Sequence, residues 1–367
     1  MLNHARAFRD RGWRVTLAGA LENALPEDLA ADSGVRVWEL RAGAAMLLRN
    51  VVALTRRLAA DESWSVAFVQ NPPGFPAVFA AWLGSAARGA AVVVDWHNLG
   101  STLLALAPER SRFAVNIYRL LERIPALRTG LHVSVSQALA RHWGLKTARV
   151  VYDAPSRRTH VVRPLDRGEW WRRVWPDQPL PRIDACWVAA PSSWGRDEDL
   201  DALRRVAHLA ATRSALWHDS RLVVFATGRG PGREKFEREL GQLPAGPIEI
   251  RTGWLPAGAY PEFLTLADAG LCLHVSSSGL DLPMKLADFG GAGLPALVRD
   301  YGPVLDELGA EPSIMRFHTD DELETCLRNL ARDGEAPCKP HRAEEWEARW
   351  THALDGWLRR FETEVVV

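Results

Sequence analysis

Short hydrophobic runs alternate with amphipathic stretches along almost the whole chain. In the first part, helical patterns at residues 44–60 and 113–128 lie among the strand-like runs VRVWEL, SVAFVQ, AAVVVDW, LHVSVS and ARVVY. Apolar runs of this length, alternating with patterns of helical period, predict a parallel sheet covered by helices. The chain opens with a helix, since Leu2, Ala5 and Phe8 share one helical face that ends at Gly12, before the strand WRVTLAG.

A repeating βα pattern normally opens with a strand, whose carboxyl end carries the first ligand-binding loop. Because this chain opens with a helix, two interpretations are open: the fold is unusual, or the chain begins after its first strand and loop. We favour the second. Residues 1–154 are therefore predicted to form a Rossmann-like domain that lacks its first strand.

The alternating pattern breaks down at residues 155–181, which are rich in arginine, proline and tryptophan and predict an interdomain linker. A second set of strands follows at DACWVAA, RLVVFAT, IEIRTG, GLCLHV and PALV, with helices predicted at 197–212, 233–240, 259–267 and 284–290. Residues 182–340 thus predict a second Rossmann-like domain of similar size. Residues 341–367 hold a tryptophan-rich helical pattern that we expect to pack across the domain junction.

Composition narrows the functional classes. With 367 residues, 47% of them hydrophobic, the chain can bury two cores. Lysine plus arginine equals aspartate plus glutamate at 45 each, so no global charge would recruit nucleic acid. The four cysteines form no CxxC pair, which fits a reducing compartment. No run of about 20 apolar residues predicts a membrane span.

The segment HVSSSGLDLPMKLAD, residues 274–288, carries the strongest chemical signal. A strand ends at its start, and a helix begins near Pro283. A helix N-terminus presents unpaired N–H groups and a partial positive charge, so it can hold a diphosphate, and Lys285 would add a full charge. Asp288 could accept hydrogen bonds from ribose hydroxyls. The alternative is a capped helix with Lys285 and Asp288 as an i,i+3 ion pair.

A glycine-rich turn follows another predicted strand in VVFATGRGPGREKF. Gly228 and Gly230 would let backbone N–H groups approach a ligand, and Arg229 or Arg233 could meet phosphate. Glycines in such turns also serve purely steric purposes, so this signal is weak by itself.

In the first half, VDWHNLG places Asp95, His97 and Asn98 at the carboxyl edge of the sheet, where open α/β sheets bind ligands. His97 could act as a general base, with Asp95 orienting its ring. The alternative is a structural histidine that is hydrogen-bonded in a turn. QNPPGFP ends another strand, and its prolines rigidify a loop that could shape an acceptor cleft.

Taken together, these motifs resemble one family, the chitobiosyldiphosphodolichol beta-mannosyltransferases of glycosyltransferase family 33, which have the GT-B fold. The resemblance implies two Rossmann-like domains that face a cleft. The resemblance rests on QNPPGFP, VVDWHNLG, TGRGPGRE and LHVSSSGLDLPMKLAD, supported by VYDAP and SSWGRDEDL, in colinear order along nearly the whole chain. It implies transfer of the first β-1,4-linked mannose from GDP-mannose to dolichol-diphosphate chitobiose, with inversion, during N-glycan precursor assembly.

The resemblance also implies roles for residues. His97 and Asp95 would be catalytic. Donor binding would fall to Gly228, Gly230, Arg233, His274, Ser276, Ser277, Ser278, Gly279, Asp281, Pro283, Met284, Lys285 and Asp288. The acceptor side would comprise Gln70, Asn71, Pro72, Pro73 and Asn98. Neither a metal nor a tightly bound cofactor is expected. The expected partners are the lipid-linked acceptor, the cytosolic face of the endoplasmic reticulum membrane and other lipid-linked oligosaccharide mannosyltransferases.

The sequence departs from the family at its start, where the family has an apolar anchor helix, a first strand and a glycine-containing loop. The alternative function is therefore a truncated, non-catalytic paralogue that binds GDP-mannose or acts as a partner of the glycosylation machinery. The amphipathic stretch 44–60, with Arg49, Arg56 and Arg57, could lie in a bilayer surface. It could equally be an ordinary helix that packs on the sheet.

Overall fold

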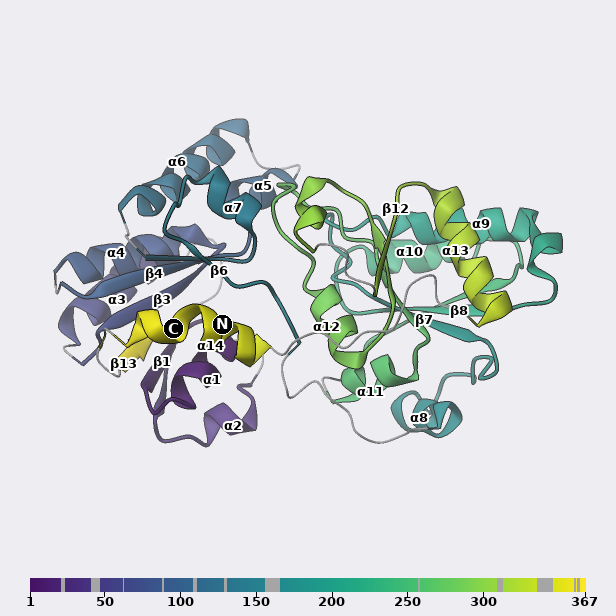
Figure 1. The fold of residues 1–367 in the computed structure, drawn as a ribbon, viewed down its shortest axis with the longest axis horizontal. Coiled ribbons are helices and arrows are strands. Elements are labelled where there is room, and N and C mark those ends of the chain that lie inside the picture. The colour runs from purple at the N-terminus through teal and green to yellow at the C-terminus, as the bar shows by residue number, and fades with distance from the viewer. Residues whose placement is uncertain are drawn as a thin grey trace. The chain divides into compact units, whose positions relative to one another are not determined.

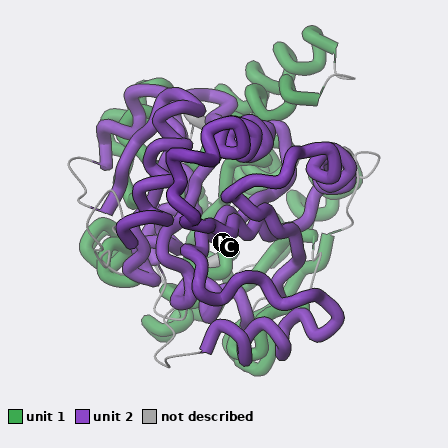
Figure 2. Tube along the Cα trace, turned by 90° about the vertical axis from the view of Figure 1, so that its right-hand side faces the viewer, with its two compact units in different colours: residues 1–152, 347–367 green, residues 153–346 purple. Residues whose placement is uncertain are grey.

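The computed structural model describes residues 1–20, 24–40, 47–61, 63–87, 89–107, 111–128, 131–155, 166–256, 258–308, 313–334, 346–359, 361 and 364–367. The chain divides into two compact units, shown in Figure 2. Unit 1 comprises Met1–Tyr152 together with Glu347–Val367, and unit 2 comprises Asp153–Trp346. Each unit is built on one parallel sheet, which confirms the predicted α/β fold with two Rossmann-like domains.

Unit 1 holds a seven-stranded sheet whose strands all pair in parallel. In spatial order the strands are β2 (Val35–Glu39), β1 (Arg14–Gly19), β13 (Glu364–Val366), β3 (Val66–Asn71), β4 (Ala91–Trp96), β5 (Leu131–Ser134) and β6 (Arg149–Val150). Its helices are α1 (Leu2–Arg9), α2 (Glu27–Ala30), α3 (Leu47–Ala60), α4 (Phe79–Ala86), α5 (Gly100–Ala105), α6 (Arg112–Arg128), α7 (Gln137–His142) and α14 (Trp346–Leu358), with a short turn, η2 (Gly74–Val78).

The C-terminal strand β13 occupies the place where a first strand would lie. In a doubly wound sheet the first strand lies between the second and the fourth. Here β13 lies between β1 and β3, parallel to both, and pairs Val366 with Thr16 and with Ala67. In this structure a strand from the C-terminal part of the sequence therefore connects β1 and β3 in the sheet.

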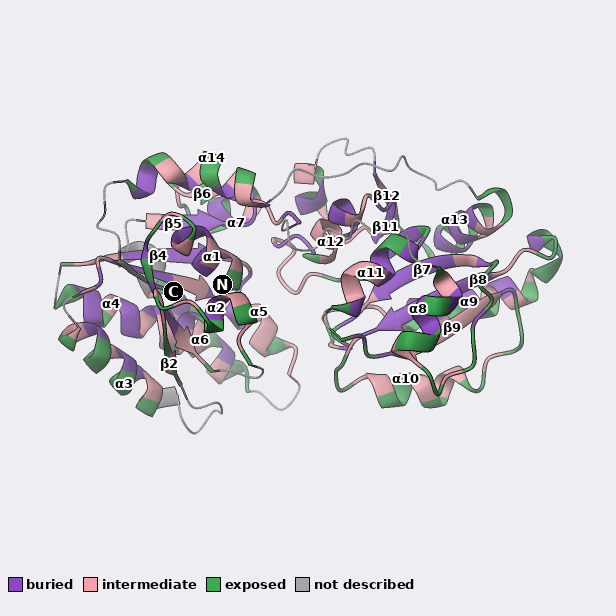
Figure 3. Cartoon of the chain, turned by 90° about the horizontal axis from the view of Figure 1, so that it is seen from below, coloured by how far each residue is buried: buried purple, intermediate pink, exposed green. Residues whose placement is uncertain are grey.

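Unit 2 has a six-stranded parallel sheet in the doubly wound order. In spatial order its strands are β12 (Ile314–Phe317), β11 (Ala296–Arg299), β10 (Ala269–Cys272), β7 (Cys186–Pro191), β8 (Leu222–Thr227) and β9 (Ile248–Gly253). The helices are α8 (Arg167–Val174), α9 (Asp201–Thr212), α10 (Arg233–Leu240), α11 (Ala259–Leu266), α12 (Lys285–Ala292) and α13 (Asp320–Asp333), with short turns η4 (Ser214–Trp217) and η5 (Pro303–Leu308). Every residue of β8 is buried, as the colouring in Figure 3 shows.

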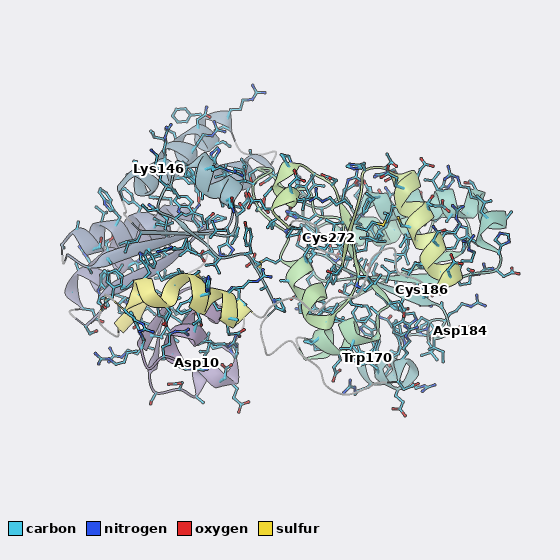
Figure 4. All side chains as sticks on the ribbon, viewed as in Figure 1. Asp10, Lys146, Trp170, Asp184, Cys186 and Cys272 are labelled. Atoms are coloured by element: carbon cyan, nitrogen blue, oxygen red, sulfur yellow. The ribbon has the colours of Figure 1, made fainter. Side chains whose placement is uncertain are left out.

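The structure corrects the predicted linker over residues 166–181, while residues 156–165 lie outside the described part of the chain. Within residues 155–181, α8 is a helix of unit 2, capped by the Asp166 side chain. Trp170 stacks on Phe263 of α11 with ring centroids 5.5 Å apart, and Figure 4 labels it beside that helix. Trp171 packs on Phe225 in the core. Both tryptophans are therefore core residues of unit 2.

Two helices of unit 1 bear on further expectations from the sequence. The stretch 44–60 forms α3 over its described part, and Val51, Leu54 and Leu58 are buried, so α3 packs its apolar face inside the unit. The C-terminal helix α14, expected to pack across the domain junction, belongs to unit 1, where Trp350 packs edge-on against Phe8. In the part of the chain that the structure describes, no helix is long and apolar enough to cross a membrane.

Candidate active site

The predicted pair Asp95 and His97 meets at the end of β4 in unit 1. Asp95 is the fifth residue of the strand and is buried, and His97 follows the strand directly. The His97 Nε2 atom lies 2.7 Å from Asp95 Oδ2. The backbone N–H of His97 donates to the Asn71 carbonyl of β3 at 2.8 Å, so two neighbouring strands fix the ring's position. The His97 side chain stays one-fifth exposed and can reach a ligand.

A second histidine, which the sequence analysis did not single out, reaches the same carboxylate. His4 of α1 places its Nε2 atom 3.1 Å from Asp95 Oδ2. On its other side, His4 Nδ1 accepts a 2.9 Å hydrogen bond from the indole N–H of Trp350 in α14. His4 and Trp350 are both buried. A continuous hydrogen-bonded relay therefore runs from Trp350 through His4 and Asp95 to His97.

The relay fixes where the protons lie. An indole N–H only donates, so His4 Nδ1 must accept, and His4 carries its proton on Nε2, facing Asp95. Burial lowers the pKa of His4, against the opposing charge of Asp95, and keeps this ring neutral. Burial alone would raise the pKa of Asp95, but its interactions with the His97 and His4 rings, which include a hydrogen bond from each ring, hold it well below its usual range. Asp95 is thus an anion that accepts from both rings, and the basic nitrogen of neutral His97 is Nδ1.

His4, Asp95 and His97 are also residue types that ligate metals, and their ligand atoms lie close together. Both imidazoles direct a nitrogen at one carboxylate oxygen at hydrogen-bonding distance, so these atoms satisfy one another. The donor set reads as a hydrogen-bonded relay.

The predicted acceptor-side residues divide into two groups. Asn71 and Asn98 are buried and bond within unit 1: Asn71 Nδ2 donates to Glu122 Oε1 at 2.9 Å, and Asn98 Oδ1 accepts from the Leu99 N–H at 2.7 Å. The Glu122 carboxylate of α6 also accepts from the N–H of Gly100 at 2.6 Å, which ties α6 to the start of α5. By contrast, Gln70, Pro72 and Pro73 line a mostly apolar cavity of about 650 Å³.

In unit 2, the donor-type residues surround the start of α12. Lys285 is the first residue of this helix, and its ammonium pairs with the Glu198 carboxylate, which is 3% exposed. Glu198 also accepts from the Ser192 hydroxyl and, at 3.1 Å, from the Ser193 N–H. Burial would raise the pKa of Glu198, but Lys285 and these hydrogen bonds lower it. Lys285 therefore pairs with the buried Glu198 carboxylate and not with Asp288, the partner in the alternative interpretation.

The loop between β10 and α12 is held by Asp281. Its carboxylate accepts from the Ser276 hydroxyl and lies 3.0 Å from His274 Nε2, while Ser276 Oγ accepts from the Gly279 N–H at 2.7 Å. Ser278 Oγ joins the same network. Gly279 has φ +70°, a conformation that glycine adopts without strain. The hydrogen bonds among these residues hold the loop in its conformation. Met284, at the end of the loop, is 65% exposed.

Asp288 lies one turn into α12 and is half-buried. It accepts a 3.0 Å hydrogen bond from the Tyr260 hydroxyl of α11. Burial raises the pKa of Asp288 to about 6, although the Tyr260 hydrogen bond opposes this. The group therefore titrates close to neutral pH, and its ionised form is a hydrogen-bond acceptor that a ribose could use.

The glycine-rich turn after β8 packs against backbone. A Cβ at Gly228 would lie 1.8 Å from the Ser192 carbonyl oxygen, and one at Gly230 would lie 1.9 Å from that of Ser193. These glycines are required because two loops touch through their backbones. Arg233 pairs with Glu237 at 2.7 Å, and Arg229 stacks over the Trp254 ring at 4.2 Å.

Sequence reasoning missed His4, Trp350, Glu122, Glu198 and Tyr260. Glu198 carried a signal, since it lies in the SSWGRDEDL block that follows a strand. The others lie on helices with no distinctive spacing, and only the fold brings them to the site.

Comparison with known proteins places these features in a family. Residues 1–164 match the glycosyl transferase 4-like domain. The chain is 32% identical to a chitobiosyldiphosphodolichol beta-mannosyltransferase of Eremothecium gossypii, over 90% of this chain and 75% of that protein. It belongs to this family of glycosyltransferases. The human protein of the same name is 28% identical over 90% of this chain and 81% of its own length. The UDP-glycosyltransferase TURAN of Arabidopsis thaliana is 30% identical over 80% of this chain and 74% of its own length.

Solved structures agree on the fold of this glycosyltransferase. Sucrose-phosphate synthase from Thermosynechococcus elongatus superimposes with a TM-score of 0.66 at 14% identity, covering 98% of this chain and 91% of that chain. Anabaena HepE in complex with UDP-glucose gives 0.61 at 12% identity, covering 92% and 95%. The predicted GT-B fold, an α/β fold with two Rossmann-like domains, is thereby confirmed.

Proposed function

We propose that this glycosyltransferase transfers mannose from GDP-mannose to chitobiosyl-diphosphodolichol with inversion and forms a β-1,4 linkage. The observation that carries the proposal is the 32% identity to a chitobiosyldiphosphodolichol beta-mannosyltransferase across nine-tenths of the chain. The relay at His97 and the donor-type residues at α12 are consistent with this chemistry.

The proposed reaction is a single displacement. His97 Nδ1 takes the proton from the attacking sugar hydroxyl as its oxygen bonds to the mannose anomeric carbon. The bond from that carbon to the diphosphate breaks on the opposite face, and GDP leaves with the electron pair. Asp95 stabilises the imidazolium that forms, because it is ionised and lies 2.7 Å from His97 Nε2.

The departing diphosphate is proposed to meet the N-terminus of α12 and Lys285. In the structure Lys285 pairs with Glu198, so donor binding would draw the ammonium onto the diphosphate while Glu198 keeps its bonds to Ser192 and Ser193. Asp288 would hold the ribose. The loop between β10 and α12 would be kept in shape by His274, Ser276 and Asp281. The turn after β8 would pack closely on the Ser192–Ser193 backbone, because Gly228 and Gly230 have no side chain.

The proposed donor, location and partners are inferred from the relatives, whose names specify a lipid-linked acceptor. No tightly bound cofactor is required, and GDP-mannose is the donor substrate. The protein would work on the cytosolic face of the endoplasmic reticulum membrane, beside other lipid-linked oligosaccharide mannosyltransferases.

A direct assay tests the proposal. The purified chain is incubated with GDP-mannose and a chitobiosyl-diphosphate lipid in detergent, and the lipid product is treated with a β-mannosidase. We expect a product one hexose heavier whose added sugar the β-mannosidase removes. Absence of transfer by the wild-type chain, together with intact GDP binding, would favour the non-catalytic alternative.

One similarity supports a second class of donor substrate. The chain is 30% identical to the UDP-glycosyltransferase TURAN, so a UDP-sugar is the competing donor class. Parallel titrations with GDP and UDP discriminate between the two. We expect GDP to bind more tightly, and tighter binding of UDP would replace GDP-mannose with a UDP-sugar.

A further inference from the structure

One helix of unit 1 exposes a row of large apolar side chains. On α6, Phe113 is 75% exposed, Leu120 is 59% exposed and Ile117 is 42% exposed. The spacing of four and three residues places them on one side of the helix. We call these three residues the α6 apolar face. Exposed apolar side chains are usually scattered, so a contiguous row on one helix indicates a surface that meets an apolar partner.

The opposite side of α6 is held against the candidate active site. Val115 and Glu122 are buried there, and at about 100° per residue they project roughly opposite the α6 apolar face. Glu122 bonds to the Asn71 side chain and the Gly100 N–H, next to the loop that carries His97. The helix packs on α5, which Figure 1 shows beside it, and also on η2. The α6 apolar face is thus about one helix diameter, roughly 10 Å, from the acceptor-side loop.

The exposed charged side chains in the described part of α6 are all positive. Arg112, Arg119 and Arg123 are exposed and form a second row that flanks the α6 apolar face on one side. The only acidic residue within 112–128 is Glu122, which is buried. A helix with an apolar side, a flanking arginine row and no exposed carboxylate complements an anionic lipid surface, whose acyl region takes the apolar side chains and whose headgroups meet the arginines.

We propose that α6 docks unit 1 onto a bilayer that contains anionic lipids, with the α6 apolar face inserted among the acyl chains. The membrane-surface helix is therefore α6, whereas α3, the stretch that sequence reasoning offered for this role, buries Val51, Leu54 and Leu58. Docking would bring the Asn71–His97 edge to the headgroup level, where a lipid-linked diphosphate sugar lies. The role of docking in presenting the acceptor rests on the proposed function, but binding of α6 to a bilayer can be measured independently of that function.

The test is flotation of the full chain with vesicles of phosphatidylcholine containing phosphatidylserine, compared with phosphatidylcholine alone. We expect binding to the mixed vesicles that weakens with salt. The double variant Phe113→Ser/Leu120→Ser should lower the vesicle partition coefficient about tenfold or more, because two large apolar side chains no longer insert. Arg119→Gln/Arg123→Gln should lower binding to mixed vesicles and reduce its salt dependence.

Val52→Ser is the matched control, since Val52 is 42% exposed on α3, as Ile117 is on α6, and should leave vesicle binding unchanged. Unchanged binding of the Phe113→Ser/Leu120→Ser variant would overturn the inference. A second result would also overturn it: the wild-type chain does not bind vesicles but forms a dimer in solution, and this variant is a monomer. Mannose transfer to an acceptor dispersed in detergent tests the proposed function separately. Vesicle binding that depends on α6, without any mannose transfer, would therefore contradict only the proposed function.

Discussion

At the scale of single residues, Asp288 links donor binding to pH. Burial raises its pKa to about 6, and a ribose hydroxyl that donates to the carboxylate favours the ionised form. Because binding then prefers the deprotonated state, GDP should bind most tightly above pH 6 and lose affinity as the pH falls through this value. Calorimetric titration of GDP between pH 5 and pH 7.5 measures the change, expected to be about tenfold.

The variant Asp288→Asn supplies the control for this prediction. It keeps the shape of the side chain and an oxygen that accepts from Tyr260. Its GDP affinity should be low at every pH and flat across the same range. A variant that retains the wild-type pH dependence would assign the titration to another group.

Trp350 should act on the reaction through His4. In Trp350→Phe the ring still packs beside Phe8, but the N–H that holds His4 Nδ1 as an acceptor is gone. His4 can then take a second proton more readily, and its positive charge offsets the Asp95 anion that stabilises protonated His97. We expect turnover to fall about three- to tenfold, more steeply at acidic pH, with the KM for GDP-mannose unchanged.

The profile of kcat against pH distinguishes this role from simple loss of packing. Trp357→Phe removes an indole from the same helix and should leave the profile in place. If Trp350→Phe lowers kcat by one factor at every pH, its role is structural and the relay is not functional.

At the scale of elements, the strands were predictable because both faces of a parallel sheet are buried. β4 begins with four apolar residues and β8 with five, and strands that contain such runs can be predicted from sequence alone. α8 was not, because Trp170 and Trp171 stand among charged residues and only their fit against α11 and β8 makes them core. The adjacency of Asp95 and His97 followed from one strand end, whereas His4 reaches Asp95 only through the packing of α1.

β13 could not be predicted, since three residues carry no period and their partners lie at the other end of the chain. Its position makes it a stabilising element. Val366 is buried, and the Val367 N–H donates to Thr16 while its carbonyl accepts from Ala18. Val366→Asp should destabilise the protein by about 2–4 kcal/mol, because a carboxylate would lie in the middle of the sheet.

Chemical denaturation followed by tryptophan fluorescence measures this loss. Val37→Asp introduces the same carboxylate on the edge strand β2, where the side chain is 40% exposed, and should cost far less. Equal midpoints for the two variants would mean that β13 contributes little to the sheet.

At the scale of the whole molecule, the candidate base and the donor-type residues belong to different units. His97 and its relay lie entirely in unit 1, and Lys285, Glu198 and Asp288 lie in unit 2. Each unit can therefore be impaired without disturbing the other's hydrogen bonds. The GT-B fold was predictable from the two alternating patterns, but this separation of roles depends on which side chains each sheet edge gathers.

The separation makes a paired prediction. His97→Ala should lower turnover about 10²- to 10⁴-fold with GDP affinity unchanged, because only the proton acceptor is lost. Lys285→Gln should weaken GDP binding about tenfold or more, because a charge-assisted contact to the diphosphate disappears. In this variant the buried Glu198 carboxylate lacks its cation, so the melting temperature must be measured to show that the protein is still folded. Lys285→Arg keeps a positive charge and should restore part of the GDP affinity. Loss of GDP affinity in His97→Ala would show that unit 1 shares in donor binding, and unchanged affinity in a folded Lys285→Gln would remove Lys285 from the donor site.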